Sequence, residues 1–184
     1  IHGSALGGIV VPGGAQAPAI SDAGSPIVIR DTHVYDAGRA GMVLNGDGQI
    51  DMIIEGSYFH DNGRAGILLN DFGSLTIDNS EIYNNGTSSI KTAGIYLQDV
   101  SSVIITRSQI HDNPMAGIAI EGTSNVTIGA DLDEVDPFAY GNDIYGNIRA
   151  GVQIGGLSSI PLNGNLVIRG NYLHNNGSGS LGGG

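Results

Sequence analysis

The sequence of 184 residues contains no cysteine and no tryptophan, and only 5% of its residues are aromatic. Without cysteine, neither a disulfide framework nor a thiolate metal site can form. With so few rings, large side chains cannot fill a wide globular core. The 40% of residues that are hydrophobic still suffice for a core, and they suit a narrow one made of stacked aliphatic side chains.

Basic residues are also scarce: 7 lysines and arginines face 18 aspartates and glutamates, which gives a net charge of −11. A chain this acidic repels the phosphate backbone of nucleic acids, so we expect no nucleic-acid partner. No apolar run is long enough to cross a bilayer, and the first residues do not have the pattern of a signal peptide. The chain lacks an initiating methionine, as expected of a mature secreted protein or of a segment of a longer one.

Glycine, by contrast, is abundant, with 31 residues, and one unit is repeated throughout the chain. The unit IEGSYFHDNGRAGILL at residues 54–69 recurs in edited form at 29–44, 77–97, 105–120, 142–154 and 168–177. The apolar residue before each Tyr or His marks the repeats: Ile1, Val34, Phe59, Ile82, Ile110, Ile144 and Leu173. These residues are 23 positions apart at the closest (59 to 82) and 34 at the widest (110 to 144), a period that indicates a solenoid.

Each unit holds three short runs in which apolar and other residues alternate, for example at 52–54, 57–59 and 67–69. Alternation with a period of two indicates strands, and no segment has the spacing of a helix. We therefore predict one all-β domain over residues 1–184, a parallel β-helix (β-solenoid) of about six coils with three short strands each. It begins and ends within a repeat.

Equivalent positions should form columns along the solenoid axis, about 4.8 Å apart. Two inward columns are aliphatic, with Ile29, Ile54, Ile77, Ile105, Ile128 and Ile168 in one and Met42, Ile67, Ile95, Ile118 and Val152 in the other. A small polar column can bond from coil to coil: Thr32, Ser57, Ser80, Ser108, Asn142 and Asn171.

Asparagine recurs at the turn after the second strand, at Asn62, Asn85, Asn113, Asn147 and Asn176. Asparagine tolerates the left-handed conformation that such a turn needs, and stacked amides bond to one another. We therefore predict a structural asparagine ladder.

Histidine and tyrosine alternate along the outward column of the second strand: His2, Tyr35, His60, Tyr83, His111, Tyr145 and His174. The column two residues earlier adds the rings of His33, Tyr58 and Tyr172. Histidines two coils apart are about 9.6 Å from each other, too far for metal–nitrogen bonds of about 2 Å, so we expect no metal here. Two interpretations stay open: cross-strand packing of rings, or a platform for sugar rings or a neighbouring protein.

An outward column of the third strand is largely apolar: Val10, Val43, Leu68, Tyr96, Ala119 and Gln153. Exposed strands favour β-branched residues in any case. A contiguous apolar stripe also marks contact surfaces, so lateral packing against another chain or domain is the other expectation.

The units resemble those of the right-handed parallel β-helix repeat families, the pectin-lyase-like superfamily. That superfamily includes polysaccharide lyases, mannuronan epimerases, phage tailspikes and long bacterial surface proteins. Residues 126–147, which begin with VTIG and end with GNDIYGN, are similar to a variant repeat of large secreted β-helix proteins. The resemblance covers nearly the whole chain and implies a right-handed helix in an extracellular or cell-surface location. It says little about activity, because one fold hosts many functions.

Catalytic residues would lie where the repeat is broken, in the loop at 129–142. Mannuronan epimerases carry an Asp-Pro-His motif with tyrosines nearby, and the loop holds DPFAY at 136–140. Phe138 cannot act as the acid or base that the histidine supplies. Lyases need a basic residue, and this acidic loop has none. If the chain is an enzyme, Asp136, Tyr140 and Asp133 are the candidates, with paired carboxylates for glycoside hydrolysis; otherwise the loop is a solvated acidic segment.

A partial resemblance to a dockerin-type calcium loop lies at residues 45–51, with Asn45, Asp47 and Asp51 as candidate ligands. The first and twelfth ligand positions fall on Val43 and Ile54, which have no side-chain oxygen. A plain turn is therefore expected, and calcium is the alternative.

These patterns favour a non-catalytic structural or adhesive module without a cofactor. The alternative is a polysaccharide-active enzyme (lyase, C5-epimerase or glycoside hydrolase) or a carbohydrate-binding β-helix. The open ends of a β-helix template strand addition, and Ile1 and Leu173 occupy the same phase of the repeat. We therefore also expect association end to end, as a head-to-tail filament or within a longer solenoid.

Overall fold

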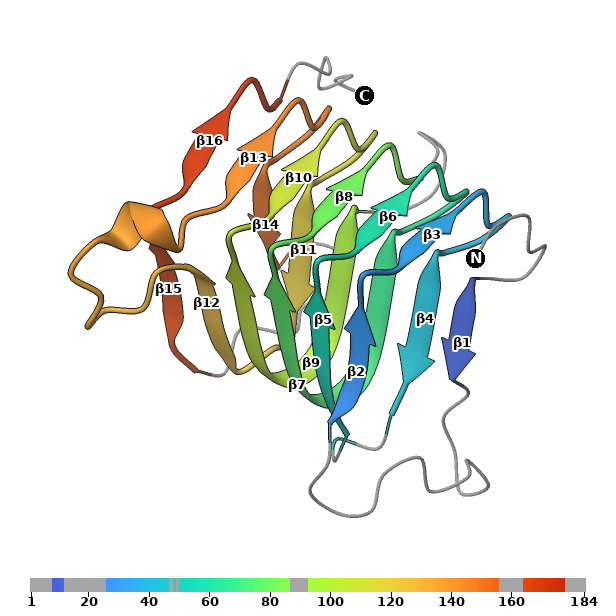
Figure 1. The fold of residues 1–184 in the computed structure, drawn as a ribbon, viewed down its shortest axis with the longest axis horizontal. Coiled ribbons are helices and arrows are strands. Elements are labelled where there is room, and N and C mark those ends of the chain that lie inside the picture. Colours follow the sequence, from blue (N-terminus) through green and yellow to red (C-terminus); the bar gives the residue numbers. More distant parts are fainter. Residues whose placement is uncertain are drawn as a thin grey trace.

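The computed structural model describes residues 8–11, 26–46, 48, 50–86, 93–155 and 164–177, which wind into coils of three strands (Figure 1). The first strands are β2 (Ile27–Arg30), β5 (Asp51–Glu55), the second parts of β7 (Ile67–Asp78) and β9 (Ile95–Thr106), β12 (Asn125–Gly129) and β15 (Leu166–Arg169). The second strands are β3 (His33–Tyr35), β6 (Tyr58–His60), β8 (Glu81–Tyr83), β10 (Gln109–His111), β13 (Asp143–Tyr145) and β16 (Tyr172–His174). The third strands are β1 (Ile9–Val11), β4 (Met42–Asn45), the first parts of β7 and β9, β11 (Ile118–Glu121) and β14 (Val152–Ile154). The 3₁₀ helix η1 (Pro137–Ala139) lies between β12 and β13, and no described helix is long and apolar enough to cross a membrane.

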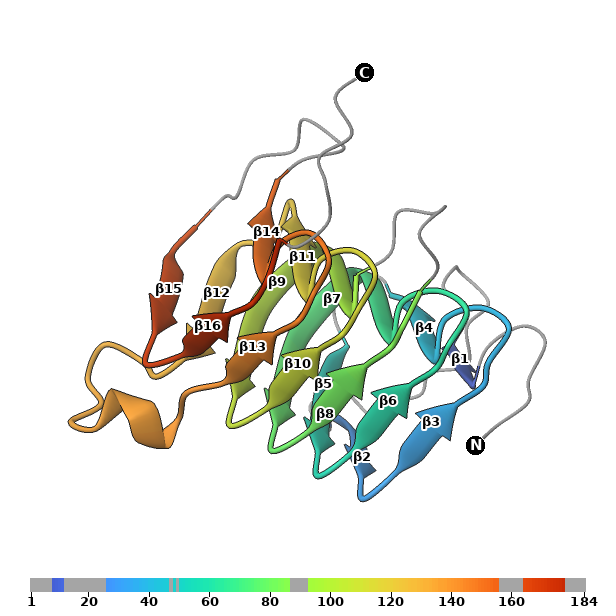
Figure 2. The same ribbon diagram turned by 90° about the horizontal axis from the view of Figure 1, so that it is seen from above.

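The strands pair in parallel, each beside the strand of the same kind in the next coil (Figure 2). The second strands form a separate sheet in the order β16-β13-β10-β8-β6-β3. The first and third strands share one sheet, because β7 and β9 run from the third strand of one coil into the first strand of the next. This confirms the predicted parallel β-helix, with one difference: these two strands are 12 residues long rather than short.

The long strands stay continuous because the corner between their two parts is filled and paired. Each bends at an aspartate with positive φ, Asp71 (54°) or Asp99 (52°). The next residues, Phe72 and Val100, are buried and paired with each other across the two coils. Side-chain packing and backbone pairing therefore continue around the bend.

The inward aliphatic columns have the predicted register. Met42 pairs with Ile67, Ile67 pairs with Ile95, and Ile54 pairs with Ile77. These side chains are fully buried, and each contributes about 1.5–3 kcal/mol of hydrophobic stabilisation. In the last coil the inward positions are exposed instead: Leu166, Ile168 and Leu173.

The small polar column bonds from coil to coil as predicted. The backbone N–H of Ser57 donates to Oγ of Ser80 (3.1 Å), and that of Ser80 donates to Oγ of Ser108 (3.1 Å). The N–H of Ser108 donates to Oδ1 of Asn142 (2.9 Å), so an amide replaces the hydroxyl without interrupting the column.

The asparagine ladder is confirmed as a chain of buried amides. Nδ2 of Asn62 donates to Oδ1 of Asn85 (2.8 Å), that of Asn113 to Asn147 (3.0 Å), and that of Asn147 to Asn176 (2.9 Å). The same oxygens accept backbone N–H groups, for example from Asn85 to Asn113 (3.0 Å). Each amide therefore satisfies groups of two coils that would otherwise be buried without a partner.

The ladder asparagine is not the left-handed residue of this turn. The expectation that asparagine occurs here because it tolerates the left-handed conformation is therefore wrong. The residue before the asparagine has the positive φ: Asp61 (52°), Asn84 (51°), Asp112 (53°), Gly146 (64°) and Asn175 (54°). That residue turns the chain, and the asparagine side chain can then point inward and bond along the axis.

We expect Asn113→Ala to destabilise the protein by about 3 kcal/mol, because it removes the acceptor of the buried N–H of Asn85 and the amide that donates to the carbonyls of Ile82 and His111. Urea unfolding followed by circular dichroism measures the change. Asn45→Ala, at an exposed position at the end of β4, is the control and should change stability by less than about 0.5 kcal/mol. Equal effects of the two substitutions would contradict a structural ladder.

Candidate functional site

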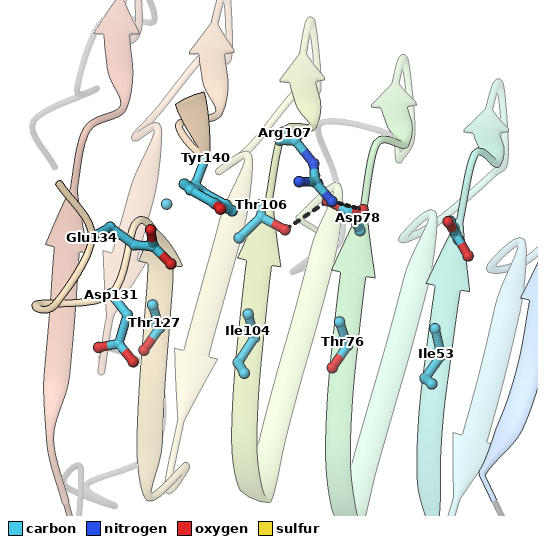
Figure 3. Close-up of a pocket in the computed structure, with 12 residues that line it drawn as sticks. Ile53, Thr76, Asp78, Ile104, Thr106, Arg107, Thr127, Asp131, Glu134 and Tyr140 are labelled. Atoms are coloured by element: carbon cyan, nitrogen blue, oxygen red, sulfur yellow. Dashed lines mark hydrogen bonds and ion pairs between the residues drawn. The ribbon is translucent and has the colours of Figure 1, made fainter. Parts of the chain in front are cut away.

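A groove of about 370 Å³ crosses the outer face of the first strands β5, β7, β9 and β12 (Figure 3). Its floor is a row of outward β-branched side chains, one from each coil: Ile53, Thr76, Ile104 and Thr127. Outward positions of a strand alternate with the inward aliphatic ones, so the period-two pattern that fills the core also lays this floor.

Polar side chains at the strand ends form one long wall of the groove. Glu55 pairs with Asp78, and Asp78 pairs with Thr106, so three successive coils contribute to one row. Tyr140 continues the row in the next coil. The N–H of Arg107 donates to the carbonyl of Tyr140 (3.1 Å), just as the N–H of Asn79 donates to that of Thr106 (3.2 Å).

Residues 130–139 are thus an insertion in the turn after β12, and the chain returns to the coil at Tyr140. Arg169 of β15 fixes the start of the insertion, since its Nη1 donates to the carbonyls of Asp131 (2.7 Å) and Leu132 (3.0 Å). Asp131 and Glu134 line the end of the groove.

Arg107 and Asp78 form a bidentate ion pair on the wall. Nε of Arg107 donates to Oδ1 of Asp78 (2.9 Å), Nη2 donates to Oδ2, and the hydroxyl of Thr106 donates to Oδ1 (2.7 Å). The guanidinium carbon lies 5.6 Å from the centroid of the Tyr140 ring, a cation–π contact.

This pairing fixes the charges of both groups. Burial tends to raise the pKa of Asp78, but the bonds from Arg107 and Thr106 and the charge of Arg107 outweigh it, so the pKa lies below its usual value. The bond to Asp78 raises the pKa of Arg107. The pair is therefore ionised across the whole physiological range and is neutral as a unit.

Of the three candidate catalytic residues, only Tyr140 lines the groove. Oδ1 of Asp136 accepts the N–H of Phe138 (3.1 Å) and caps η1, so its carboxylate has a structural role. Asp133 is exposed and is not among the lining residues. The loop itself contains no basic residue, but Arg169 bonds to its start and Arg107 contacts Tyr140 at its end. These contacts from other coils were not predicted from the sequence. The available signal was Arg107 itself, the one basic residue at a turn position that other coils fill with Asp, Asn or Gly.

The tyrosines and histidines of the second strand stack along the axis. From Tyr35 through His60, Tyr83, His111 and Tyr145 to His174, successive ring centroids are 4.6–5.1 Å apart and the ring planes differ by 1–5°. His2 lies outside the described residues. The inner rings therefore cover each other's faces and present only their edges to solvent. A sugar that stacks on an aromatic ring needs an open face, so we favour the packing interpretation.

Carboxylates bind the ring edges of this stack. His111, only 8% exposed, places Nε2 2.9 Å from Oε1 of Glu81 and Nδ1 2.9 Å from Oδ2 of Asp112. Burial, together with the charge of Glu81 and other neighbours, raises the pKa of Tyr83. Burial and the charges of nearby carboxylates raise that of Tyr145 in the same way.

The second ring column has two separate pairs. Tyr58 stacks on His33 at 4.4 Å. Tyr172 lies against Phe138 of η1, with centroids 5.5 Å apart, and each of these two rings is 58% exposed. This pair lies outside the groove lining.

The apolar column of the third strand has the predicted register. It is not uniformly exposed: Val10 is open, Leu68 is half-buried and Ala119 is buried. Burial, the charge of Glu121 and a hydrogen bond to it raise the pKa of Tyr96 to about 12. Lateral packing on this column stays a prediction.

The three candidate calcium ligands, Asn45, Asp47 and Asp51, do not form a recognisable site among the described residues. Asp47 lies outside the described residues, and Asn45 is exposed at the end of β4. Oδ1 of Asp51 accepts a hydrogen bond from Oγ of Ser74 (2.6 Å). Among the described residues, no group of three or more His, Asp or Glu side chains could hold a metal ion.

Stacked coils, inward ladders and an outer groove define a β-solenoid protein. The family model for the right-handed beta helix region matches residues 19–182, nearly the whole chain, so the chain belongs to that family and its β-helix is right-handed. No curated protein and no solved structure matches it.

We expect Tyr83→Ala to lower stability by about 1–2 kcal/mol, because it removes a ring stacked between His60 and His111. Thermal unfolding by circular dichroism measures the change. Tyr172→Ala, which removes a ring at the end of the other column, is the control and should have a smaller effect. Unchanged stability in Tyr83→Ala would contradict a packing role for the stack.

Asp78→Asn should destabilise the protein by about 0.5–1 kcal/mol at pH 7, since Arg107 is half exposed and solvent screens the pair. Because the pKa of Asp78 is lowered on folding, its contribution is present above the unfolded pKa of about 3.9 and is lost as the pH falls through the folded value. The difference between wild type and variant should therefore shrink in urea unfolding at pH 3. Asp133→Asn, on an exposed carboxylate, is the control; a difference that grows at pH 3 would contradict the assignment.

Proposed function

We propose that the chain is a structural or adhesive β-solenoid module of an extracellular protein, and that the groove is its binding surface for an uncharged carbohydrate. The composition of the groove is the main support for this binding role. The floor alternates isoleucine and threonine side chains, and the wall beside it carries carboxylates, one threonine, one guanidinium and one tyrosine. Pockets that bind small molecules combine apolar surface with a few placed polar groups, and a sugar offers both apolar faces and hydroxyls.

The polar groups of the groove suit hydroxyl recognition. Thr76, Thr106 and Thr127 can donate and accept, the carboxylates accept, and Arg107 donates. The ring of Tyr140 supplies an amphipathic surface on the wall. These groups come from successive coils, so an extended ligand across the strands would contact a different polar group in each coil.

Charge favours an uncharged ligand over a uronate. Arg107 is neutralised by Asp78, and Glu55 is paired with Arg30 (2.7 Å). Asp131 and Glu134 have no cationic side-chain partner among the described residues, so the groove carries net negative charge. Like charges brought together at an interface disfavour binding, which argues against polyuronates.

Chemistry on a bound glycan is less well supported than binding. A lyase base must give up its own proton to accept one from the sugar, and the raised pKa of Arg107 opposes that. Asp136 is committed to capping η1. Asp131 and Glu134 form no ion pair with another described residue, and two carboxylates on the same groove favour a glycoside hydrolase as the second candidate, since that reaction uses two such groups.

The regular ladders support a structural role. Buried amides, hydroxyls and aliphatic side chains repeat in every middle coil, which gives a stiff scaffold on which the groove is held. Residues 1–7 and 178–184, on which the predicted end-to-end contact depends, lie outside the described residues. End-to-end association of chains along the axis of the β-helix therefore stays part of the proposed function.

Binding is tested by affinity electrophoresis and calorimetry with neutral β-glucans, mannans and xylans against alginate and pectate. We expect a neutral glycan to bind and Tyr140→Ala to weaken binding about tenfold, or about 1.4 kcal/mol. Tyr172→Ala, an exposed tyrosine outside the groove lining, is the matched control and should bind normally.

Product formation is followed in the same mixtures. Release of reducing ends that Glu134→Gln abolishes would replace the non-catalytic proposal by the hydrolase. Preferential binding of polyuronates, or equal binding by the wild type and Tyr140→Ala, would overturn the groove as the site for an uncharged glycan.

A further inference from the structure

Arg107 has a backbone conformation that its residue type disfavours. Ten non-glycine residues in the described part of the chain have positive φ, and nine of them are Asp or Asn. The exception is Arg107, with φ of 48°. Asp and Asn tolerate the left-handed region because their short side chains bond locally, whereas a long side chain there is an uncommon and strained choice.

The turn itself does not call for arginine. The same turn after the first strand has a positive φ in the other coils, at Asp31 (47°), Gly56 (57°), Asn79 (46°) and Gly170 (74°). Each of these coils makes the turn with a residue suited to it. An asparagine or glycine at position 107 would therefore satisfy the backbone at least as well.

What distinguishes Arg107 is that it joins three coils on the groove wall. Its guanidinium binds Asp78 in the preceding coil through Nε and Nη2. Tyr140 in the following coil receives its backbone N–H and lies over its side chain. Tyr140 is also the residue at which the inserted loop returns to the coil, so Arg107 fixes the position of the loop end relative to the wall (Figure 3).

The contribution of the Arg107 side chain to the stability of the fold does not by itself explain an arginine at this position. The Arg107 side chain is 49% exposed, and exposed ion pairs and cation–π contacts stabilise a fold only weakly. That gain is of the same order as the strain of a non-glycine residue in the left-handed region. Strained residues persist mainly where the surrounding site uses them.

We propose that Arg107 is a positioning residue of the groove: it holds the ring of Tyr140 and the end of the inserted loop against Asp78 and Thr106. In doing so it sets the shape of the wall that the ligand meets. The identity of the ligand rests on the proposed function, whereas the role of Arg107 in positioning the groove wall does not.

The test is Arg107→Asn, which suits the left-handed turn and removes the side-chain contacts. We expect its melting temperature to stay within about 3 °C of the wild type, because relief of strain offsets the lost ion pair. Binding of a neutral glycan should fall at least about tenfold. Amide hydrogen exchange at position 107, Tyr140 and Gly141 should be faster than in the wild type, while exchange in β7 and β9 stays unchanged.

Two variants control the test. Arg39→Asn makes the same change at an exposed turn position remote from the groove lining and should leave binding and exchange as in the wild type. Arg107→Lys keeps the charge but cannot form the bidentate bond, so its binding should lie between those of the wild type and Arg107→Asn.

The outcomes distinguish a residue that positions the groove wall from one that only stabilises the fold. A large drop in melting temperature in Arg107→Asn, with exchange raised throughout the first strands, would show that Arg107 is a structural clamp and overturn the inference. Unchanged exchange at Tyr140 and Gly141 would also overturn it. If the wild type binds none of the neutral glycans, the proposed function fails, and the exchange data by themselves still decide whether Arg107 holds the wall.

Discussion

Successive coils of this protein are joined by parallel strand pairing. This pairing sets each residue beside the residue at the same position of the next coil, at the spacing of hydrogen-bonded strands. Any feature of one coil is therefore repeated beside itself. Aliphatic side chains then form continuous inward columns, amides bond to amides, and rings stack on rings. The same constraint sets the like charges of Glu55 and Asp78 side by side, and each of these carboxylates forms an ion pair with an arginine, Arg30 or Arg107, which offsets their repulsion.

Coils of this kind need sharp corners, and the residues at the corners decide where function can be added. Aspartate, asparagine and glycine take the positive φ at nearly every bend, which leaves strands free to pair on both sides. The insertion at 130–139 lies in one such corner. It does not disturb the stack, because the carbonyl of Tyr140 accepts the same coil-to-coil bond as that of Thr106. A loop can therefore build one end of a groove while the scaffold beneath it stays regular.

The groove and the ring stack show two different uses of an outward column. In the ring stack, neighbouring side chains cover each other and leave little for a ligand to contact. In the groove, each coil contributes one β-branched side chain to the floor, and the polar residues beside them come from different coils. Recognition is therefore better placed on the face where the repeat is interrupted than on the face where it is most regular.

The coil period, the register of the inward and outward columns and the partners within the asparagine ladder could all be predicted from the amino-acid sequence. This is possible because parallel pairing converts sequence alignment directly into spatial neighbours: Ile67 pairs with Ile95, and Asn113 bonds to Asn147. Three features became apparent from the folded chain alone: Asp136 caps η1, the left-handed residue precedes each ladder asparagine, and Arg107 bonds to Asp78, 29 residues away, beside Tyr140. The physical reason is that a loop outside the repeat has no aligned neighbour to fix its path. Its position follows from contacts with side chains of other coils, and these exist only once the coils are stacked.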